Sequence, residues 1–118
     1  MKKISKNEIT AVILAGGQAS RMDGEDKGLI VFRELPLISH VINITKPKVS
    51  QILISANRNF EEYANFGKVI SDDLEGYQGP LAGISKALKV CSTPYLLVLP
   101  CDSPLIDAAL IDSLIEKM

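Results

Sequence analysis

The chain begins its first apolar run with Ile9-Thr10-Ala11-Val12-Ile13-Leu14 and continues directly into Ala15-Gly16-Gly17. The run is short, rich in β-branched residues and free of polar alternation, which is typical of a strand buried on both faces of a parallel sheet. Two adjacent glycines then place a loop at the carboxyl end of that strand, where open parallel sheets bind their ligands. This stretch therefore predicts the class of fold and the edge of the sheet that carries function.

The rest of the chain alternates between similar apolar runs and amphipathic segments. Further strands are expected at Gln51–Ser55, Lys68–Ile70 and Tyr95–Leu99. Helices are expected where apolar residues recur at helical spacing, at Leu37–Thr45, Leu81–Val90 and Ile106–Ile115. Two segments are too short for periodicity to decide: Leu29–Phe32 is a strand or the edge of a loop, and Glu61–Asn65 is left open as a short helical turn. The alternation, without repeat or linker, predicts one α/β domain over residues 1–118 with a mostly parallel sheet flanked by helices.

Composition narrows the class of protein. The 118 residues include 13 Lys and Arg against 14 Asp and Glu, so there is no broad basic surface for nucleic acid or anionic lipid. No apolar run approaches the roughly 18 residues that a membrane span needs. The two cysteines, Cys91 and Cys101, are too few for a disulfide framework and fit buried thiols in a reducing cytoplasm. We therefore expect a soluble, cytoplasmic protein with no nucleic-acid or membrane partner.

The loop after the first strand has the composition of a phosphate cradle. Gly16 and Gly17 let backbone N–H groups approach an anion, while Arg21 and Lys27 can neutralise phosphate charge. The loop lacks the Gly-Lys-Ser/Thr of a Walker motif and the Gly-x-Gly-x-x-Gly of dinucleotide folds. The plainer alternative is a glycine-rich surface loop with solvated charges, and the presence of Arg21, Lys27 and Gly28 together at these offsets disfavours it.

Two acidic features follow later strands. Asp102 stands between Pro100 and Pro104 after the last predicted strand, and its carboxylate is a hard oxygen ligand suited to Mg²⁺ that carries nucleotide phosphates. Its alternative role, equally weighted, is to cap a helix that begins near Pro104, which Ser103 could also do. Asp72, with Asp73, follows the third strand and could contact a base, a ribose or a metal-bound water, or simply form a turn.

Other residues have plainer interpretations. Gly79-Pro80-Leu81-Ala82-Gly83 opens a helix and offers N–H groups to an anion or a base, although helix initiation alone explains it almost as well. His40 lies in an apolar helical pattern with no second ligand nearby, so packing or a hydrogen bond is expected rather than catalysis.

Several motifs taken in series resemble the molybdenum cofactor guanylyltransferases, from about Ile9 to the end of the chain. They are Leu14-Ala15-Gly16-Gly17, Arg21-Met22, Asp26-Lys27-Gly28, Ala56-Asn57-Arg58, Gly79-Pro80-Leu81-Ala82-Gly83 and Pro100-Cys101-Asp102-Ser103-Pro104. The resemblance implies a Rossmann-like nucleotidyltransferase fold. It also implies transfer of GMP from GTP to molybdopterin with release of pyrophosphate, and Mg²⁺ as cofactor.

The resemblance also implies roles for individual residues. By this resemblance, the nucleotide is bound by Leu14, Ala15, Gly16, Gly17, Lys27, Asp72 and Asp102. Asp102 would also bind the metal ion, and the catalytic residues would be Arg21 and Asp102. Gly16 favours guanine, because related cytidylyltransferases usually carry Ala there. Two departures from the family pattern, Asp23 for a glycine and Ser55 for an asparagine, put contacts to phosphate and nucleotide in question.

Family members are usually longer, and the last helix ends at Met118 without a Gly or Asn cap, which is typical of an interrupted chain. We therefore expect an N-terminal nucleotide-binding portion of a longer protein. Enzyme alternatives are a cytidylyl- or a sugar-phosphate nucleotidyltransferase. Non-enzymatic alternatives are a truncated nucleotide-binding module and a receiver-like module, which fits poorly because it leaves the glycine loop unexplained. A second copy of the chain or a molybdoenzyme-maturation partner remains open.

Overall fold

A computed structural model describes residues 4–15, 21–22, 25–56, 59–71, 80–101 and 106–117. Its centre is a four-stranded sheet in the order β7-β6-β1-β8. All neighbouring strands in this sheet are parallel. The strands are β1 (Ile9–Leu14), β6 (Gln51–Ala56), β7 (Lys68–Ser71) and β8 (Tyr95–Pro100). The parallel sheet that the apolar runs predict is thus confirmed.

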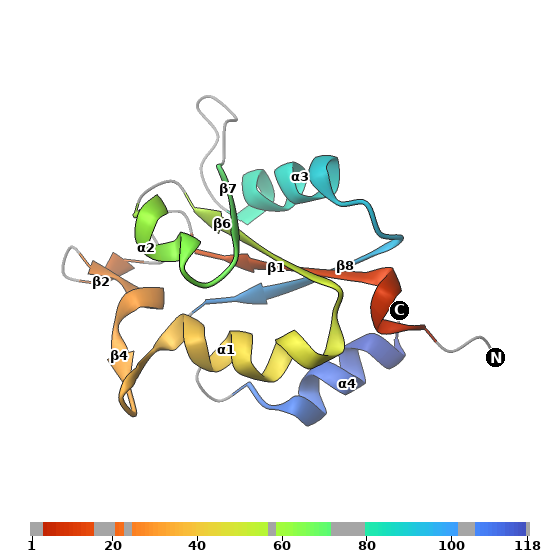
Figure 1. Cartoon of the computed structure of the whole chain (residues 1–118), viewed down its shortest axis with the longest axis horizontal. Coiled ribbons are helices and arrows are strands. Elements are labelled where there is room, and N and C mark those ends of the chain that lie inside the picture. The colour runs from red at the N-terminus through yellow and green to blue at the C-terminus, as the bar shows by residue number, and fades with distance from the viewer. Residues whose placement is uncertain are drawn as a thin grey trace.

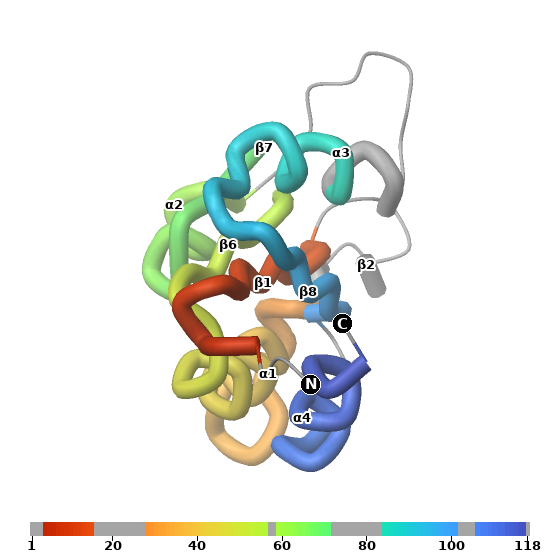
Figure 2. Tube along the Cα trace, turned by 90° about the vertical axis from the view of Figure 1, so that its right-hand side faces the viewer, coloured from red at the N-terminus to blue at the C-terminus, as the bar shows by residue number. Residues whose placement is uncertain are grey.

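Helices cover both faces of the sheet. Figure 1 shows α3 (Pro80–Val90) above the strands, with α1 (Leu37–Thr45) and α4 (Ala108–Glu116) below them. The view turned by 90° in Figure 2 shows the same layers from the side. Helix α4 packs beside α1, where Ile111 is fully buried and Lys48 forms an ion pair with Asp112. The three-layer arrangement buries both faces of the sheet, as its uninterrupted apolar strands require.

Alternate residues of the strands supply two cores. In β1, Ala11 and Ile13 belong to the core cluster on the side of α1 and α4, which also contains Ile111. The intervening Val12 belongs to a smaller cluster with Ala87 of α3. Because successive side chains of a strand point to opposite faces, five consecutive residues with almost no exposed surface, Ile9 to Ile13, need a layer on each side.

The ends of the helices largely match those predicted from the sequence. Helix α1 spans the predicted residues, and α3 begins one residue early because Pro80 occupies its first turn, a position that proline tolerates. The expected start of α4 at Ile106 is wrong. Asp107 is the N-cap, and its side chain accepts a hydrogen bond of 2.8 Å from the backbone N–H of Leu110, so the helix begins at Ala108.

The two undecided segments have short ordered structures. Residues Phe60–Ala64 form α2, and Lys27–Leu29 form a 3₁₀ turn. After that turn, β4 (Val31–Phe32) pairs antiparallel with β5 (Leu35–Pro36). The two residues between them have positive φ angles of 52° and 72°, a combination found in tight hairpin turns.

His40 has the packing role expected of it. Its Nε2 atom hydrogen-bonds with the carbonyl oxygen of Phe32, and the two rings meet edge to face with centroids 5.6 Å apart. Cys101 is buried as expected, whereas Cys91 is only half-buried, because it lies where the chain leaves α3. Among the described helices, none has the length and apolar character needed to cross a bilayer.

Candidate functional site

The four parallel strands end side by side at one edge of the sheet. Leu14 at the end of β1 is in register with Ser55 of β6 and with Pro100 of β8. One residue on, the backbone N–H of Ala15 donates a 2.8 Å hydrogen bond to the carbonyl oxygen of Ser55. Ser55 in turn is in register with Ile70 of β7. The segments that follow these strands therefore leave the sheet together, at its carboxyl edge, which is the ligand-binding edge of open parallel sheets.

The predicted site residues divide between described and undescribed positions. Leu14 is half-buried at the end of β1, and Ala15 has no exposed surface. Outside the described residues lie Gly16, Gly17, Asp23, Asp72 and Asp102.

The chain neighbours of those undescribed residues mark where each segment starts. Ala15 precedes Gly16, Ser71 ends β7 before Asp72, and Cys101 follows β8 before Asp102. All three marker residues lie at the carboxyl edge of the sheet. The glycine loop and both acidic positions consequently begin at one edge, as the sequence predicts.

A short antiparallel pair brings the two basic positions close together in the backbone. Strand β2 (Arg21–Met22) pairs with β3 (Glu25–Asp26), and Arg21 is in register with Asp26. Lys27 comes directly after Asp26 and opens the 3₁₀ turn. Directly opposed residues of an antiparallel pair have Cα atoms only about 4.5–5.5 Å apart. Arg21 and Lys27 therefore stem from adjacent points of the backbone.

Gly28 links this basic segment to the acidic one. It is buried, and a Cβ atom added to it would lie 3.0 Å from the Tyr63 hydroxyl oxygen and 3.2 Å from Cys101 Sγ. Gly28 directly follows Lys27, and Cys101 directly precedes Asp102. Gly28 and Cys101 are in close contact. The predicted phosphate ligand, Lys27, is therefore next in sequence to one of them, and the predicted metal ligand, Asp102, is next to the other.

The alternative role of Asp102 and Ser103 as caps of the last helix is wrong. Asp107 caps α4 at Ala108, several residues after the predicted helix start near Pro104. This result removes the competing explanation based on that helix and leaves the metal role of Asp102 as a prediction.

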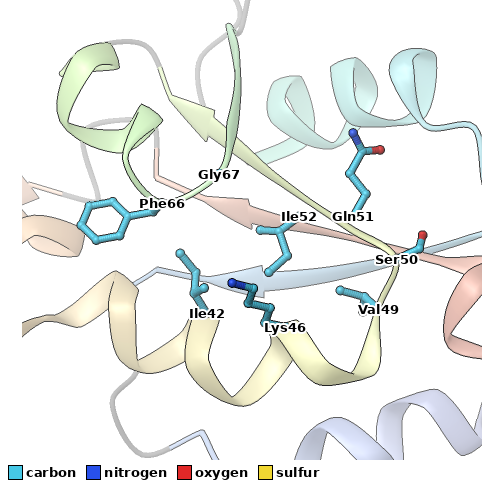
Figure 3. Close-up of a pocket in the computed structure, with 8 residues that line it drawn as sticks. All are labelled: Ile42, Lys46, Val49, Ser50, Gln51, Ile52, Phe66 and Gly67. Carbon is cyan, nitrogen blue, oxygen red and sulfur yellow. The ribbon is translucent and has the colours of Figure 1, made fainter.

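The cavity in Figure 3 lies elsewhere. It has a volume of about 220 Å³ and lies between the end of α1 and the start of β6, lined by residues that include Lys46, Gln51 and Phe66. Gln51 is the first residue of β6, so this cavity opens toward the amino edge of the sheet. Ligand pockets usually enclose about 300–1,000 Å³. The cavity is therefore smaller than a typical ligand pocket, and it does not lie at the carboxyl edge, where the segments with the predicted site residues begin.

Sequence reasoning did not identify Tyr63 as a neighbour of the site. The residue lies within the short segment whose periodicity was indecisive, and nothing local marks its ring as a contact of Gly28. Cys101 is interpreted from the sequence only as a buried thiol, although it is itself one of the residues that pack against Gly28. These relationships join residues far apart in the chain, so local pattern cannot identify them.

Comparison with known proteins gives consistent matches along nearly the whole chain. Residues 11–118 match the family described as the MobA-like NTP transferase domain. A molybdenum cofactor guanylyltransferase from Shewanella sediminis is 51% identical over 112 residues, which are 94% of this chain and 57% of that protein. Another, from Polynucleobacter asymbioticus, is 52% identical over 98% of this chain and 58% of its own length. The chain thus spans somewhat more than half the length of these curated relatives.

Solved structures share the fold at lower identity. A nucleotidyl transferase from Methanothermobacter superposes with a TM-score of 0.75 at 19% identity, covering 93% of this chain and 57% of its own. A CMP:2-keto-3-deoxy-manno-octonic acid synthetase solved with CTP has a TM-score of 0.72 at 20% identity, with 97% and 47% covered. A Mycobacterium tuberculosis protein solved with manganese has a TM-score of 0.67 at 16% identity, with 95% and 60% covered. These likenesses confirm a Rossmann-like nucleotidyltransferase fold.

Proposed function

Because the chain belongs to the family of MobA-like NTP transferase domains, we propose that it is the nucleotide-binding portion of a molybdenum cofactor guanylyltransferase. The reaction transfers GMP from GTP to molybdopterin and releases pyrophosphate. The observation that carries the proposal is identity of about half the residues to curated guanylyltransferases over 94% or more of the chain. The matched region is 57% of the length of the first of these relatives, and we assign much of the molybdopterin contact to the part of the relatives outside the match.

Phosphate binding is assigned to the carboxyl edge of the sheet. The register of Arg21 with Asp26 brings two basic positions, Arg21 and Lys27, to neighbouring points of the backbone. The loop of Gly16 and Gly17 starts from Ala15 at the same edge. Backbone N–H groups and two cations directed at one triphosphate would stabilise the charge that develops on the α-phosphate and on pyrophosphate.

We assign Mg²⁺ to a site in which the nucleotide itself supplies most of the ligands. Within the described ranges, no three His, Cys, Asp or Glu side chains gather as a metal-binding group. Mg²⁺ is commonly held by one or two carboxylates together with substrate phosphates, an arrangement that needs no such cluster. We assign the carboxylate to Asp102, which follows Cys101 at the carboxyl edge. The ion, when bound, neutralises phosphate charge and orients the leaving group.

The proposed chemistry needs positioning rather than a protein base. The attacking group is a phosphate on the pterin, which is already ionised at pH 7. It bonds to the α-phosphorus of GTP as the bond to the bridging oxygen breaks and pyrophosphate leaves. The chain's one histidine, His40, is engaged with the carbonyl oxygen of Phe32 and has no part in this step. Asp72 is assigned to GTP binding, and GTP as substrate implies a cytoplasmic enzyme.

A cytidylyltransferase or a sugar-phosphate nucleotidyltransferase on the same fold is the main enzyme alternative. The structural neighbour solved with CTP has this fold, although at 20% identity the likeness extends to the fold alone. Gly16 instead of Ala favours GTP. A module that binds nucleotide without turnover would share the binding site but not the transfer.

Calorimetric titration of the chain with GTP and then with CTP, each with and without Mg²⁺, tests the proposal. We expect GTP to bind more tightly than CTP, and Mg²⁺ to strengthen GTP binding. Preference for CTP would favour the cytidylyltransferase alternative. A folded chain that binds neither nucleotide would contradict the proposed role as the nucleotide-binding portion. The transfer itself is then tested with molybdopterin and a chain extended to the length of the relatives.

A further inference from the structure

A buried three-way contact lies beneath the segments that carry the predicted phosphate and metal ligands. Gly28 comes from the 3₁₀ turn after β3, Tyr63 from α2, and Cys101 from the end of β8. Tyr63 has no exposed surface, and Cys101 is 1% exposed. Three segments that are far apart in the chain therefore meet in a packed interior.

The glycine in this contact is required by space and not by backbone conformation. The φ angle of Gly28 lies outside the left-handed range, so an alanine could adopt the same backbone. A Cβ atom at this position would lie 3.0 Å from the Tyr63 hydroxyl, 3.2 Å from Cys101 Sγ and 3.3 Å from Cys101 Cβ. Contacts this short force a neighbour or the Gly28 backbone to move by a few tenths of an ångström. Packed interiors transmit such displacements to the segments they support.

We propose that Gly28 is a positioning residue that sets how closely the Lys27 segment packs against Cys101 at the end of β8. Lys27 directly precedes Gly28, so a shift of Gly28 relative to Cys101 would move the backbone from which Lys27 extends. The inference rests on the proposed function, in which Lys27 contacts the triphosphate of GTP and Asp102 holds its Mg²⁺. A residue without a side chain keeps the backbone next to Lys27 close to Cys101.

Tyr63 supports the spacing from the other side. Its backbone N–H donates a 3.0 Å hydrogen bond to the carbonyl oxygen of Asn59, which holds the Tyr63 backbone in the first turn of α2. The hydroxyl oxygen is the nearest atom to the position that a Gly28 side chain would take. Because Tyr63 has no exposed surface, its ring has little room to move away from an added methyl group. We therefore expect the backbone at Gly28, and Lys27 with it, to shift.

The Gly28→Ala variant tests the proposal through a ligand comparison. We expect its affinity for GTP with Mg²⁺ to fall about tenfold, because a misplacement of about 1 Å in a positioned site can cost about a hundredfold and the shift here is smaller. Affinity for guanosine, which lacks phosphates, should change little, and more Mg²⁺ should be needed for half-maximal GTP binding. Equal losses for GTP and guanosine would indicate a merely structural role and overturn the proposal.

Gly67→Ala is the matched control. A Cβ atom at Gly67 would lie 3.3 Å from the carbonyl oxygen of Ile52 and 3.4 Å from Ile54 Cδ1, so the crowding is similar. Gly67 precedes β7 and lies at the amino edge, away from the predicted site. We expect its GTP affinity to match that of the wild type. A loss of GTP affinity equal to that of Gly28→Ala would overturn the proposal.

A rescue experiment covers the case in which Gly28→Ala does not fold. Tyr63→Phe and Cys101→Ala remove the two atoms nearest to the added methyl group. Gly28→Ala combined with both should fold and regain most of the GTP affinity, measured against the Tyr63→Phe/Cys101→Ala background. A combined variant that folds without regaining affinity, or that fails to fold, overturns the proposal. If the wild type itself binds neither GTP nor CTP, the proposed function fails and this inference fails with it.

Discussion

The hydroxyl oxygens of Thr10 and Thr93 lie 2.7 Å apart and join the buried start of β1 to the turn before β8. Cys91 Sγ lies 3.2 Å from the same Thr93 hydroxyl oxygen. Burial raises the pKa of the Cys91 thiol, but side-chain hydrogen bonds with Thr93 and Thr10, together with one to the Thr93 backbone, outweigh it and lower the pKa below its ordinary value. The amino edge of the sheet thus contains a thiol that ionises more readily in the folded chain.

Thr93→Val should raise the pKa of Cys91, because it removes the hydroxyl closest to the sulfur. The pH dependence of iodoacetamide alkylation, followed by mass spectrometry, measures this directly. In the wild type the rate should rise at lower pH than in the urea-unfolded chain. The thiolate therefore stabilises the fold above the unfolded pKa, and that contribution disappears as the pH falls through the folded pKa. Cys91→Ala identifies the signal, and an unchanged pH profile in Thr93→Val would contradict the prediction.

Asp102→Ala should abolish the effect of Mg²⁺ on GTP binding while leaving the fold intact, since the proposed role of Asp102 is electrostatic. Calorimetric titration with and without Mg²⁺ measures the effect, and circular dichroism checks the fold. Asp102→Asn, which keeps the shape and removes the charge, should behave in the same way. GTP binding that still strengthens on addition of Mg²⁺ would remove Asp102 from the metal site.

Lys27→Ala should weaken GTP binding more than guanosine binding. A charge-assisted hydrogen bond is worth about 1.5–3 kcal/mol, so the expected loss for GTP is about 10- to 100-fold. Lys68→Ala is the control, because Lys68 is an exposed lysine at the amino end of β7, on the opposite edge of the sheet. Comparable losses for both ligands in Lys27→Ala would assign Lys27 a structural role instead.

Asp107→Ala should destabilise the domain through α4. The side chain accepts the Leu110 N–H, and loss of such a cap lowers the free energy of unfolding by about 1 kcal/mol. Asp112→Ala removes an ion pair with Lys48 in which Asp112 is 57% exposed, and exposed pairs contribute about 0.2–1 kcal/mol, with many contributing nothing measurable. Thermal unfolding should therefore show the larger drop in Tm for Asp107→Ala. The reverse order would contradict the capping role.

The four strands of the parallel sheet and the first helix could be predicted from sequence because their causes are local. A parallel strand buried on both faces must be an unbroken apolar run, and Ile9–Leu14 meets that condition. Helix α1 spans Leu37–Thr45, as its periodicity predicts, between Pro36 and the 3₁₀ turn that contains Pro47. The start of α4 was mistaken because apolar spacing includes Ile106, whereas the helix begins only after the Asp107 cap.

The sequence by itself determined that a parallel α/β sheet would end in a glycine loop and two acidic positions at a common edge, since strand direction alone brings those ends together. Only the tertiary structure decided how the segments meet there. The register of Arg21 with Asp26 and the contact of Gly28 with Tyr63 and Cys101 both depend on the path of the chain in space. Residues 28, 63 and 101 are far apart in sequence, and no local periodicity encodes an approach so close that a side chain at position 28 would crowd the other two, because close packing is a property of the assembled interior.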